Sequence, residues 1–366
     1  MSVCVNKKFY FEAAYSPAIA HLNPSLIPLA TRITNFIKAI VFFIPNHLIE
    51  PLIRLCVLPT SHLFFKIAVW MYKRKTAIDL HHFDTKQEPT LKYYNYTSQP
   101  FEILTPDKVK LQGHLLKHPQ HNASNARTMI LFHGNGDFYQ SSTAYWLREL
   151  LAQDTKIPYN FVLFNPRGIG NSSWGTPNEN TLRIDAESAY QLVKEQLKVA
   201  EDRIDLYGHS LGGAQAANLK ALHPKTGGRL FLDRTFSSLD TMVSHVFKKA
   251  HSRIRNIACS LVKRYGWEMD NVKTLASIQD DVHILSHKHD SVILTKCSLS
   301  QAILDGKIQR HEAATTPFYC HEWSHLCSEN PHMAPLIKNL YTPGASLQED
   351  PIFKIFQKKA VLRKAA

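Results

Sequence analysis

The stretch LYGHSLGG, residues 206–213, places a single serine between glycines in the middle of the chain. It follows an apolar run at residues 203–207 and precedes a helix-forming run at residues 214–219. The pattern predicts a strand, a tight turn and a helix, with Ser210 in the turn between two glycines. A five-residue Gly-x-Ser-x-Gly match arises by chance in many proteins, so the surrounding segments have to supply the argument.

Short apolar segments alternate with helical ones on both sides of this stretch. Segments 93–104 and 109–117 predict an antiparallel pair with a turn at Pro106 and Asp107. Further strands are expected at 128–132, 161–164, 203–207, 229–232 and 282–286, and helices at 145–151, 181–200, 295–304 and 333–341. Strands separated by helices predict an α/β fold, a mostly parallel sheet with helices on both faces.

The position of Ser210 is typical of a reactive group. In open α/β sheets ligands bind outside the carboxyl ends of the strands, and Ser210 follows such an end. A helix that begins after Ser210 directs its first amides and its positive dipole end at the serine oxygen. We therefore expect the Ser210 hydroxyl to be a nucleophile and the Leu211 N–H to donate to an oxyanion.

Two more glycine loops follow strands at the same predicted edge. The stretch HGNG, residues 133–136, comes directly after the strand 128–132. Its glycines let the backbone approach a substrate closely, so the amide of Asn135 or Gly136 is the expected second oxyanion donor. The stretch NPRGIGNS, residues 165–172, follows the next strand along the chain, and we interpret it as a structural turn.

The motifs HGNG, NPRGIGNS and GHSLGG, in this order and spacing, resemble the α/β-hydrolase superfamily over about residues 95–345. The resemblance implies an α/β-hydrolase fold, a serine hydrolase without a cofactor, and a catalytic triad in the order serine, acid, histidine. The stretch DRTFSS, residues 233–238, together with the apolar, basic N-terminus, is similar to the chlamydial and Legionella-type hydrolase-like proteins, some of which are secreted effectors.

Asp290 is the predicted acid of the triad. It follows the strand 282–286, so its carboxylate is expected at the carboxyl edge of the sheet near Ser210. Asp233 follows the strand 229–232 and is the competing choice. In either case the carboxylate would orient the imidazole that activates the serine.

The base is expected to be a histidine on the C-terminal side of Asp290. We prefer His332, because it stands just before the final helix, whose first turn carries Pro335. His325 is the alternative base, since it fits a loop after the last strand but not the helix start as well. The less favoured candidates are His311 and His321.

Cysteine and histidine crowd the same C-terminal segment, at Cys320, His321, His325, Cys327 and His332. Their spacing matches no regular zinc pattern, such as paired Cys-x-x-Cys knuckles. The 20 histidines of the chain also make local clusters common by chance. We therefore expect no metal and no other cofactor.

The N-terminal region, residues 1–80, is apolar and basic, and we expect it to be helical. Cations interrupt both of its apolar runs, 26–44 and 48–71, so neither is clean enough for a membrane span. Helices on a membrane interface and helices packed on the main domain both fit this pattern. The net charge of +13 favours an anionic membrane surface over nucleic acid, because the Lys and Arg residues are scattered rather than striped.

The first residues lack the apolar core of a cleaved signal peptide. The six cysteines are too few, in so long a chain, for a disulfide framework. We therefore expect a cytoplasmic or peripherally membrane-associated protein. The resemblance to effectors implies, in addition, secretion into a host cell without a cleaved signal peptide.

The predicted α/β-hydrolase domain, residues 93–345, contains a basic helical insertion at residues 237–280. In this superfamily an insertion at such a place resembles a lid over the active site, and a connecting helix with a solvated cationic face is the alternative. A lid would favour an anionic or membrane-bound substrate through its cations Lys248, Lys249, Arg253 and Arg255.

The sequence thus predicts a serine hydrolase that cleaves an ester, thioester or amide through an acyl-enzyme on Ser210. Its expected partner is a small-molecule or lipid acyl substrate. The alternative is a hydrolase-like effector or membrane-docked interaction protein with the same fold and an idle triad.

Overall fold

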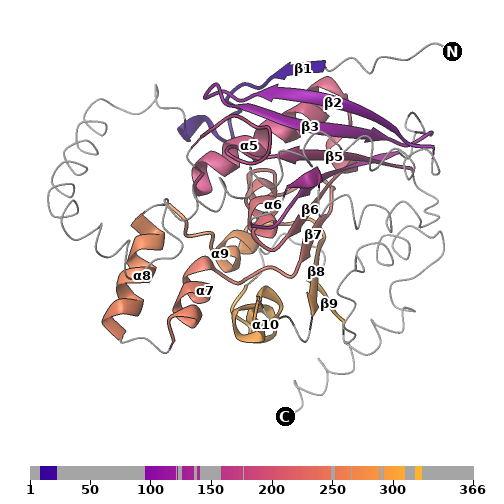
Figure 1. The fold of residues 1–366 in the computed structure, drawn as a ribbon. Coiled ribbons are helices and arrows are strands. Elements are labelled where there is room, and N and C mark those ends of the chain that lie inside the picture. Colours follow the sequence, from indigo (N-terminus) through magenta and orange to yellow (C-terminus); the bar gives the residue numbers. More distant parts are fainter. Residues whose placement is uncertain are drawn as a thin grey trace, which may run out of the picture.

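A computed structural model of the chain describes residues 9–22, 95–120, 122, 126–135, 138–140, 158–175, 177–248, 252–264, 266–287, 290, 292–309 and 318–323. These residues contain a nine-stranded sheet and the helices packed against it (Figure 1). Most of the predicted N-terminal region, and the predicted helices 145–151 and 333–341, lie outside the described residues.

The sheet is mostly parallel, with the strand order β1-β2-β3-β5-β4-β6-β7-β8-β9. β2 is antiparallel to β3 and β3 to β5, whereas every other neighbouring pair in the sheet is parallel. The strands are β1 (Phe9–Glu12), β2 (Thr97–Leu104), β3 (Lys110–Lys117), β4 (Arg127–Phe132), β5 (Tyr159–Asn165), β6 (Ile204–His209), β7 (Leu230–Asp233), β8 (Val282–His287) and β9 (Tyr319–Trp323).

Apolar side chains hold the helices against one face of this sheet. Ile130 of β4 belongs to the same buried core as Ala189 of α5 and Ala217 of α6. Strand residues that point to the other face, such as Leu131 and Tyr207, are buried as well. Burial on both faces is typical of a parallel sheet covered on two sides. The helices are α5 (Glu179–Gln191), α6 (Leu211–Leu222), α7 (Leu239–Val246), α8 (Ser252–Arg264), α9 (Asn271–Ala276) and α10 (Leu299–Leu304).

Four parallel strands bring their carboxyl ends to one edge of the sheet. Phe132 of β4 pairs with Gly208 of β6, and His209 of β6 pairs with Asp233 of β7. Asp233 in turn pairs with Leu285 of β8. The loops after β4, β6, β7 and β8 therefore leave the sheet side by side, where open α/β sheets hold their sites.

Two predicted helices differ from the observed ones in extent. The helix expected at 181–200 starts earlier, because Asn178 and Thr181 cap it reciprocally, and α5 gives way to the π-helical turn η4 (Leu192–Gln196). The helix expected at 295–304 is divided into the single turn η6 (Thr295–Cys297) and α10. Ser298 separates them, because its backbone is extended and its side chain caps α10.

β1 differs from the helical structure that the sequence analysis expects for residues 1–80, but only at residues 9–12. Residues 9–12 alternate half-buried and exposed side chains, and they add a parallel strand to the open edge of β2. The Phe9 ring packs on Phe101, with 5.7 Å between the ring centroids. The sheet therefore begins before the predicted domain boundary at residue 93. The predicted fold class, α/β with a mostly parallel sheet, is confirmed.

Candidate active site

Ser210 lies in the predicted sharp turn between β6 and α6. Its backbone has φ 53° and ψ −116°, a conformation that a residue with a Cβ adopts only at a cost of about 1–3 kcal/mol. The glycines on either side are needed for space: a Cβ at Gly208 would overlap the Gly212 carbonyl, and a Cβ at Gly212 would overlap the Phe132 carbonyl. The turn is therefore a strained strand-to-helix elbow with the serine at its tip.

Backbone and side-chain contacts hold Ser210 in this conformation. Its N–H donates to the Asp233 carbonyl at 2.9 Å, and its carbonyl accepts from the Gly213 N–H at 3.0 Å. The same carbonyl accepts from the Thr235 hydroxyl at 2.7 Å. The Ser210 side chain does not cap its own helix, so α6 leaves the hydroxyl free of that role. Leu211 is the first residue of α6, so its N–H has no carbonyl one turn earlier in the helix to bond.

The loop after β4 runs beside the elbow. A Cβ at Gly134 would lie 3.0 Å from His209 Nδ1, a tight contact, and 3.6 Å from the Ser210 Cβ, an ordinary one, so this loop packs directly against the elbow. Asn135 follows at the exposed end of this loop, whereas Gly136 lies outside the described residues. The structure thus places the loop that carries the predicted second donor next to Ser210.

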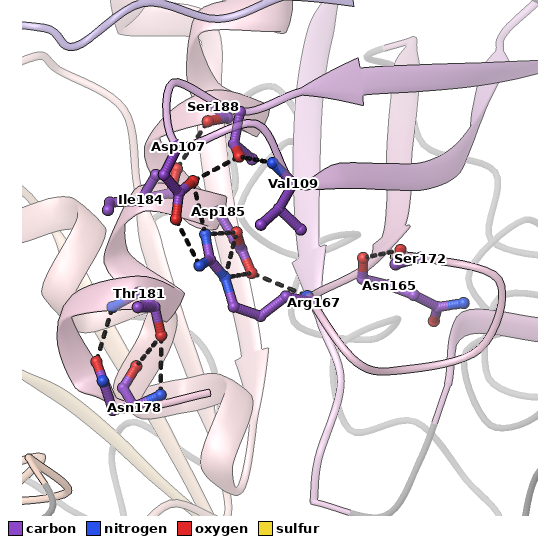
Figure 2. Close-up of polar contacts among 11 residues, drawn as sticks. Asp107, Val109, Asn165, Arg167, Ser172, Asn178, Thr181, Ile184, Asp185 and Ser188 are labelled. Atoms are coloured by element: carbon purple, nitrogen blue, oxygen red, sulfur yellow. Dashed lines mark hydrogen bonds and ion pairs between the residues drawn. The ribbon is translucent and has the colours of Figure 1, made fainter. Parts of the chain in front are cut away.

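The third glycine loop, residues 165–172, contains a buried arginine that is paired with two carboxylates (Figure 2). Arg167 is 3% exposed and its guanidinium donates to Asp185 at 2.7 Å and to Asp107 at 2.7 Å. Burial opposes ionisation of Asp107, but the hydrogen bonds from Arg167 and Thr105 outweigh it and hold the pKa of Asp107 below its usual value. These contacts agree with the structural turn that the sequence predicts.

Asp290 lies in the loop after β8. Its Oδ1 accepts the N–H groups of Val292 and Ile293, both at 2.8 Å, which fixes the carboxylate on its own loop. Ile293 packs in a small apolar cluster with Ala214, and Leu211 packs against the same cluster. The loop that carries Asp290 therefore shares an apolar cluster with the start of α6, which follows Ser210.

The competing acid, Asp233, is committed to other partners. It is 1% exposed, and its carboxylate accepts from the Tyr207 hydroxyl at 2.9 Å. Arg234 donates to both of its oxygens, with Nε to Oδ1 and Nη2 to Oδ2 at 3.0 Å each. These three bonds favour a structural role for Asp233 beneath the elbow.

The predicted bases lie outside the described residues, as do His311 and Cys327. β9, which the sequence analysis missed, runs parallel to β8 and ends at Trp323. Its end is therefore at the same edge, two residues before His325 and nine before His332. Burial raises the pKa of the Cys320 thiol to about 12, and the described residues hold no group of His, Cys, Asp and Glu arranged for a metal ion.

The insertion 237–280 forms α7, α8 and α9. Leu239 and Met242 of α7 pack against the apolar cluster that Leu211 also contacts, so α7 adjoins the elbow. Lys248 is exposed and Arg255 is half-buried, whereas Lys249 lies outside the described residues. Among the described residues we find no helix that could span a membrane.

Comparisons with known proteins agree with this arrangement. A profile of the family described as "alpha/beta hydrolase fold" matches residues 127–258, which hold the elbow. Protein bem46 of Schizosaccharomyces pombe is 28% identical over 205 residues, 56% of this chain and 64% of that protein. The protein YfhR of Escherichia coli strain K12 is 30% identical over 153 residues, 41% of this chain and 52% of that protein. The chain thus spans between half and two thirds of these two relatives.

A solved structure has the same fold. The crystal structure of an alpha-beta hydrolase from Vibrio vulnificus aligns with a TM-score of 0.52 at 17% identity, over 83% of this chain and 94% of that one. The resemblance to the chlamydial and Legionella-type subgroup stays a prediction. Sheet topology, elbow and profile together show that this chain has the α/β-hydrolase fold.

Proposed function

We propose that this protein is a serine hydrolase that cleaves an ester, thioester or amide through an acyl-enzyme on Ser210. The observation that carries the proposal is the conformation of Ser210. The chain keeps a serine at a strained position with positive φ, at the carboxyl edge, beside the Gly134 loop. Backbone strain of this kind clusters at active sites, where it is part of the mechanism.

The reaction would follow the chemistry of an activated serine. Ser210 Oγ attacks the substrate carbonyl while a histidine takes its proton, and the oxyanion accepts hydrogen bonds from the amides of Leu211 and of Asn135 or Gly136. The histidine then protonates the leaving group as its bond to the acyl carbon breaks. Water attacks the acyl-enzyme, the histidine takes a proton from it, and the carboxylic acid departs as the serine recovers its hydrogen.

Asp290 would orient the histidine and stabilise the imidazolium that forms. His332 remains our first choice as base, and the observed end of β9 gives independent support to His325. The two are separated by substituting each with alanine and measuring acyl-enzyme formation. The base variant should lose almost all of it, and the other variant should keep most.

A fluorophosphonate probe tests the proposal directly, because it reacts with an activated serine. The unmodified protein should be labelled, Ser210→Ala should not, and Ser173→Ala should be labelled like the parent. Ser173 is a fitting control because it is an exposed serine on another loop of the same edge. Absence of labelling in the unmodified protein would favour an interaction protein with an idle triad instead.

A lipid acyl substrate at an anionic membrane surface fits the basic charge of the chain and the cations of the insertion. The protein would then be cytoplasmic and peripherally associated with membranes. Sedimentation with anionic vesicles tests this: binding should exceed that to neutral vesicles and should weaken as salt is raised. Equal binding to both kinds of vesicle would contradict the electrostatic part of the proposal.

A further inference from the structure

The segment after β7 contacts both peptide groups of Ser210. The Asp233 carbonyl accepts the Ser210 N–H at 2.9 Å, and the Thr235 hydroxyl donates to the Ser210 carbonyl at 2.7 Å. Between these two contacts Arg234 has φ 47°, a left-handed conformation that turns the chain away from the path of the strand. Residues 233–235 therefore form hydrogen bonds to the backbone on both sides of Ser210.

The carbonyl that Thr235 holds belongs to the peptide unit that joins Ser210 to Leu211. A peptide unit is planar and trans, so its C=O and its N–H point in opposite directions. A bond that fixes the C=O end therefore fixes the direction of the Leu211 N–H at the other end. Donation to the carbonyl also polarises the peptide unit, which makes its N–H a stronger donor.

Thr235 has little freedom to move. It is 2% exposed, and its own carbonyl accepts the Leu299 N–H at the start of α10, at 3.0 Å. Its Cβ lies 2.7 Å from the place where a Cβ on Gly213 would stand, so α6 packs directly onto it. The hydroxyl is thus held from the core side of the elbow.

We propose that Thr235 is a positioning residue of the oxyanion site, which aims and strengthens the Leu211 N–H through the Ser210–Leu211 peptide. This inference rests on the proposed function, because it gives the Leu211 amide a transition-state charge to bind. Thr235 touches no substrate and acts only through that peptide. Its loss should therefore lower kcat and leave KM nearly unchanged.

The test compares Thr235→Val, which has nearly the same shape but no hydroxyl, with Thr235→Ser, which keeps the hydroxyl. With an aryl ester substrate, Thr235→Val should lower kcat about 3–10-fold, the effect of one net hydrogen bond, and Thr235→Ser should restore most of it. Ser188→Ala is the matched control. The Ser188 hydroxyl is buried and donates to the Ile184 carbonyl at 2.8 Å, away from the elbow, so its loss should leave kcat unchanged (Figure 2).

A thionoester of the same alcohol gives a readout that a purely structural role would not move. Its sulfur accepts hydrogen bonds poorly, so the oxyanion site contributes less to its reaction. The ratio of kcat for the oxoester to kcat for the thionoester should therefore fall in Thr235→Val. An unchanged ratio, or a kcat equal to that of the parent, would overturn the inference while Ser210-dependent turnover persists. Absence of Ser210-dependent turnover in the unmodified protein would overturn this inference and the proposed function together.

Discussion

Two glycine loops at the same edge of the sheet, residues 165–172 and 208–213, look alike in sequence and differ in the structure. In the first loop the positive φ angles fall on Gly168 and Gly170, at 77° and 53°, where no side chain opposes them. In the second, the positive φ falls on Ser210. A glycine would fit there without strain, so the retained serine is what distinguishes this loop from the first.

Their polar side chains differ as well. Arg167 belongs to the first loop, and two carboxylates bind its guanidinium, which ties this side chain to the fold (Figure 2). In the second loop the contacts engage the Ser210 backbone, whereas its side chain does not cap the helix. The difference suggests how to choose between such loops: the side chain of Arg167 holds the fold together, whereas the Ser210 side chain does not cap its helix.

The largest expected effect is the loss of turnover when Ser210 is replaced at the elbow. Ser210→Ala should lower turnover by about 10⁶-fold, because the nucleophile carries the chemistry. The free energy of unfolding should change by no more than about 0.5 kcal/mol, because one hydroxyl is lost and the backbone contacts remain. Steady-state kinetics and urea denaturation measure the two quantities. Full turnover in the variant would contradict the mechanism.

The next effect separates the two carboxylates at this edge. Asp290→Asn should lower kcat about 10⁴-fold by leaving the histidine in the wrong tautomer, with little change in stability. Asp233→Asn should instead lower stability, because it weakens the bonds to Arg234 and Tyr207. If Asp233→Asn loses activity in its folded state and Asp290→Asn does not, the acid is Asp233.

A smaller effect tests the structural loop. Arg167→Met should lower the free energy of unfolding by about 3–5 kcal/mol, because it leaves the buried Asp185 and the half-buried Asp107 without their cation. The probe reactivity of the molecules that remain folded should be unchanged. A loss of reactivity without a loss of stability would show that this loop belongs to the site.

The sequence predicts those parts of the fold that residues close together in the chain determine. The strand–turn–helix at Ser210 and the loop at Gly134 follow from short stretches whose apolar runs and glycines stand next to each other. β1 and β9 escaped prediction, because short strands at the two ends of a sheet are defined by partners far along the chain, as Phe9 is by Phe101. The roles of Thr235 and Asp233 escaped for a similar reason: neither residue type says which carbonyl or cation it will meet.

The smallest effect concerns backbone strain in the two loops. It compares the free energy of unfolding of the glycine protein with that of the alanine protein at one position in each loop. At an ordinary site alanine is the more stable by about 0.4–1 kcal/mol, because it restricts the unfolded chain. At Ser210 the Cβ carries the strain, so Ser210→Gly should be more stable than Ser210→Ala by about 1 kcal/mol, the relief of about 1–3 kcal/mol less the entropy.

At Gly168 the parent should likewise be more stable than Gly168→Ala. The nearest atom to a Cβ there, the Gly175 carbonyl oxygen at 3.4 Å, makes ordinary contact, so the φ of 77° alone would oppose alanine. Urea denaturation of the four proteins measures both differences. If the glycine protein is the more stable one at both positions, the elbow needs the same backbone conformation as the structural loop. The elbow then adopts that conformation with a serine, at a cost in stability. Alanine ahead of glycine at position 210 would remove the strain from the elbow and with it the observation on which the proposed function depends.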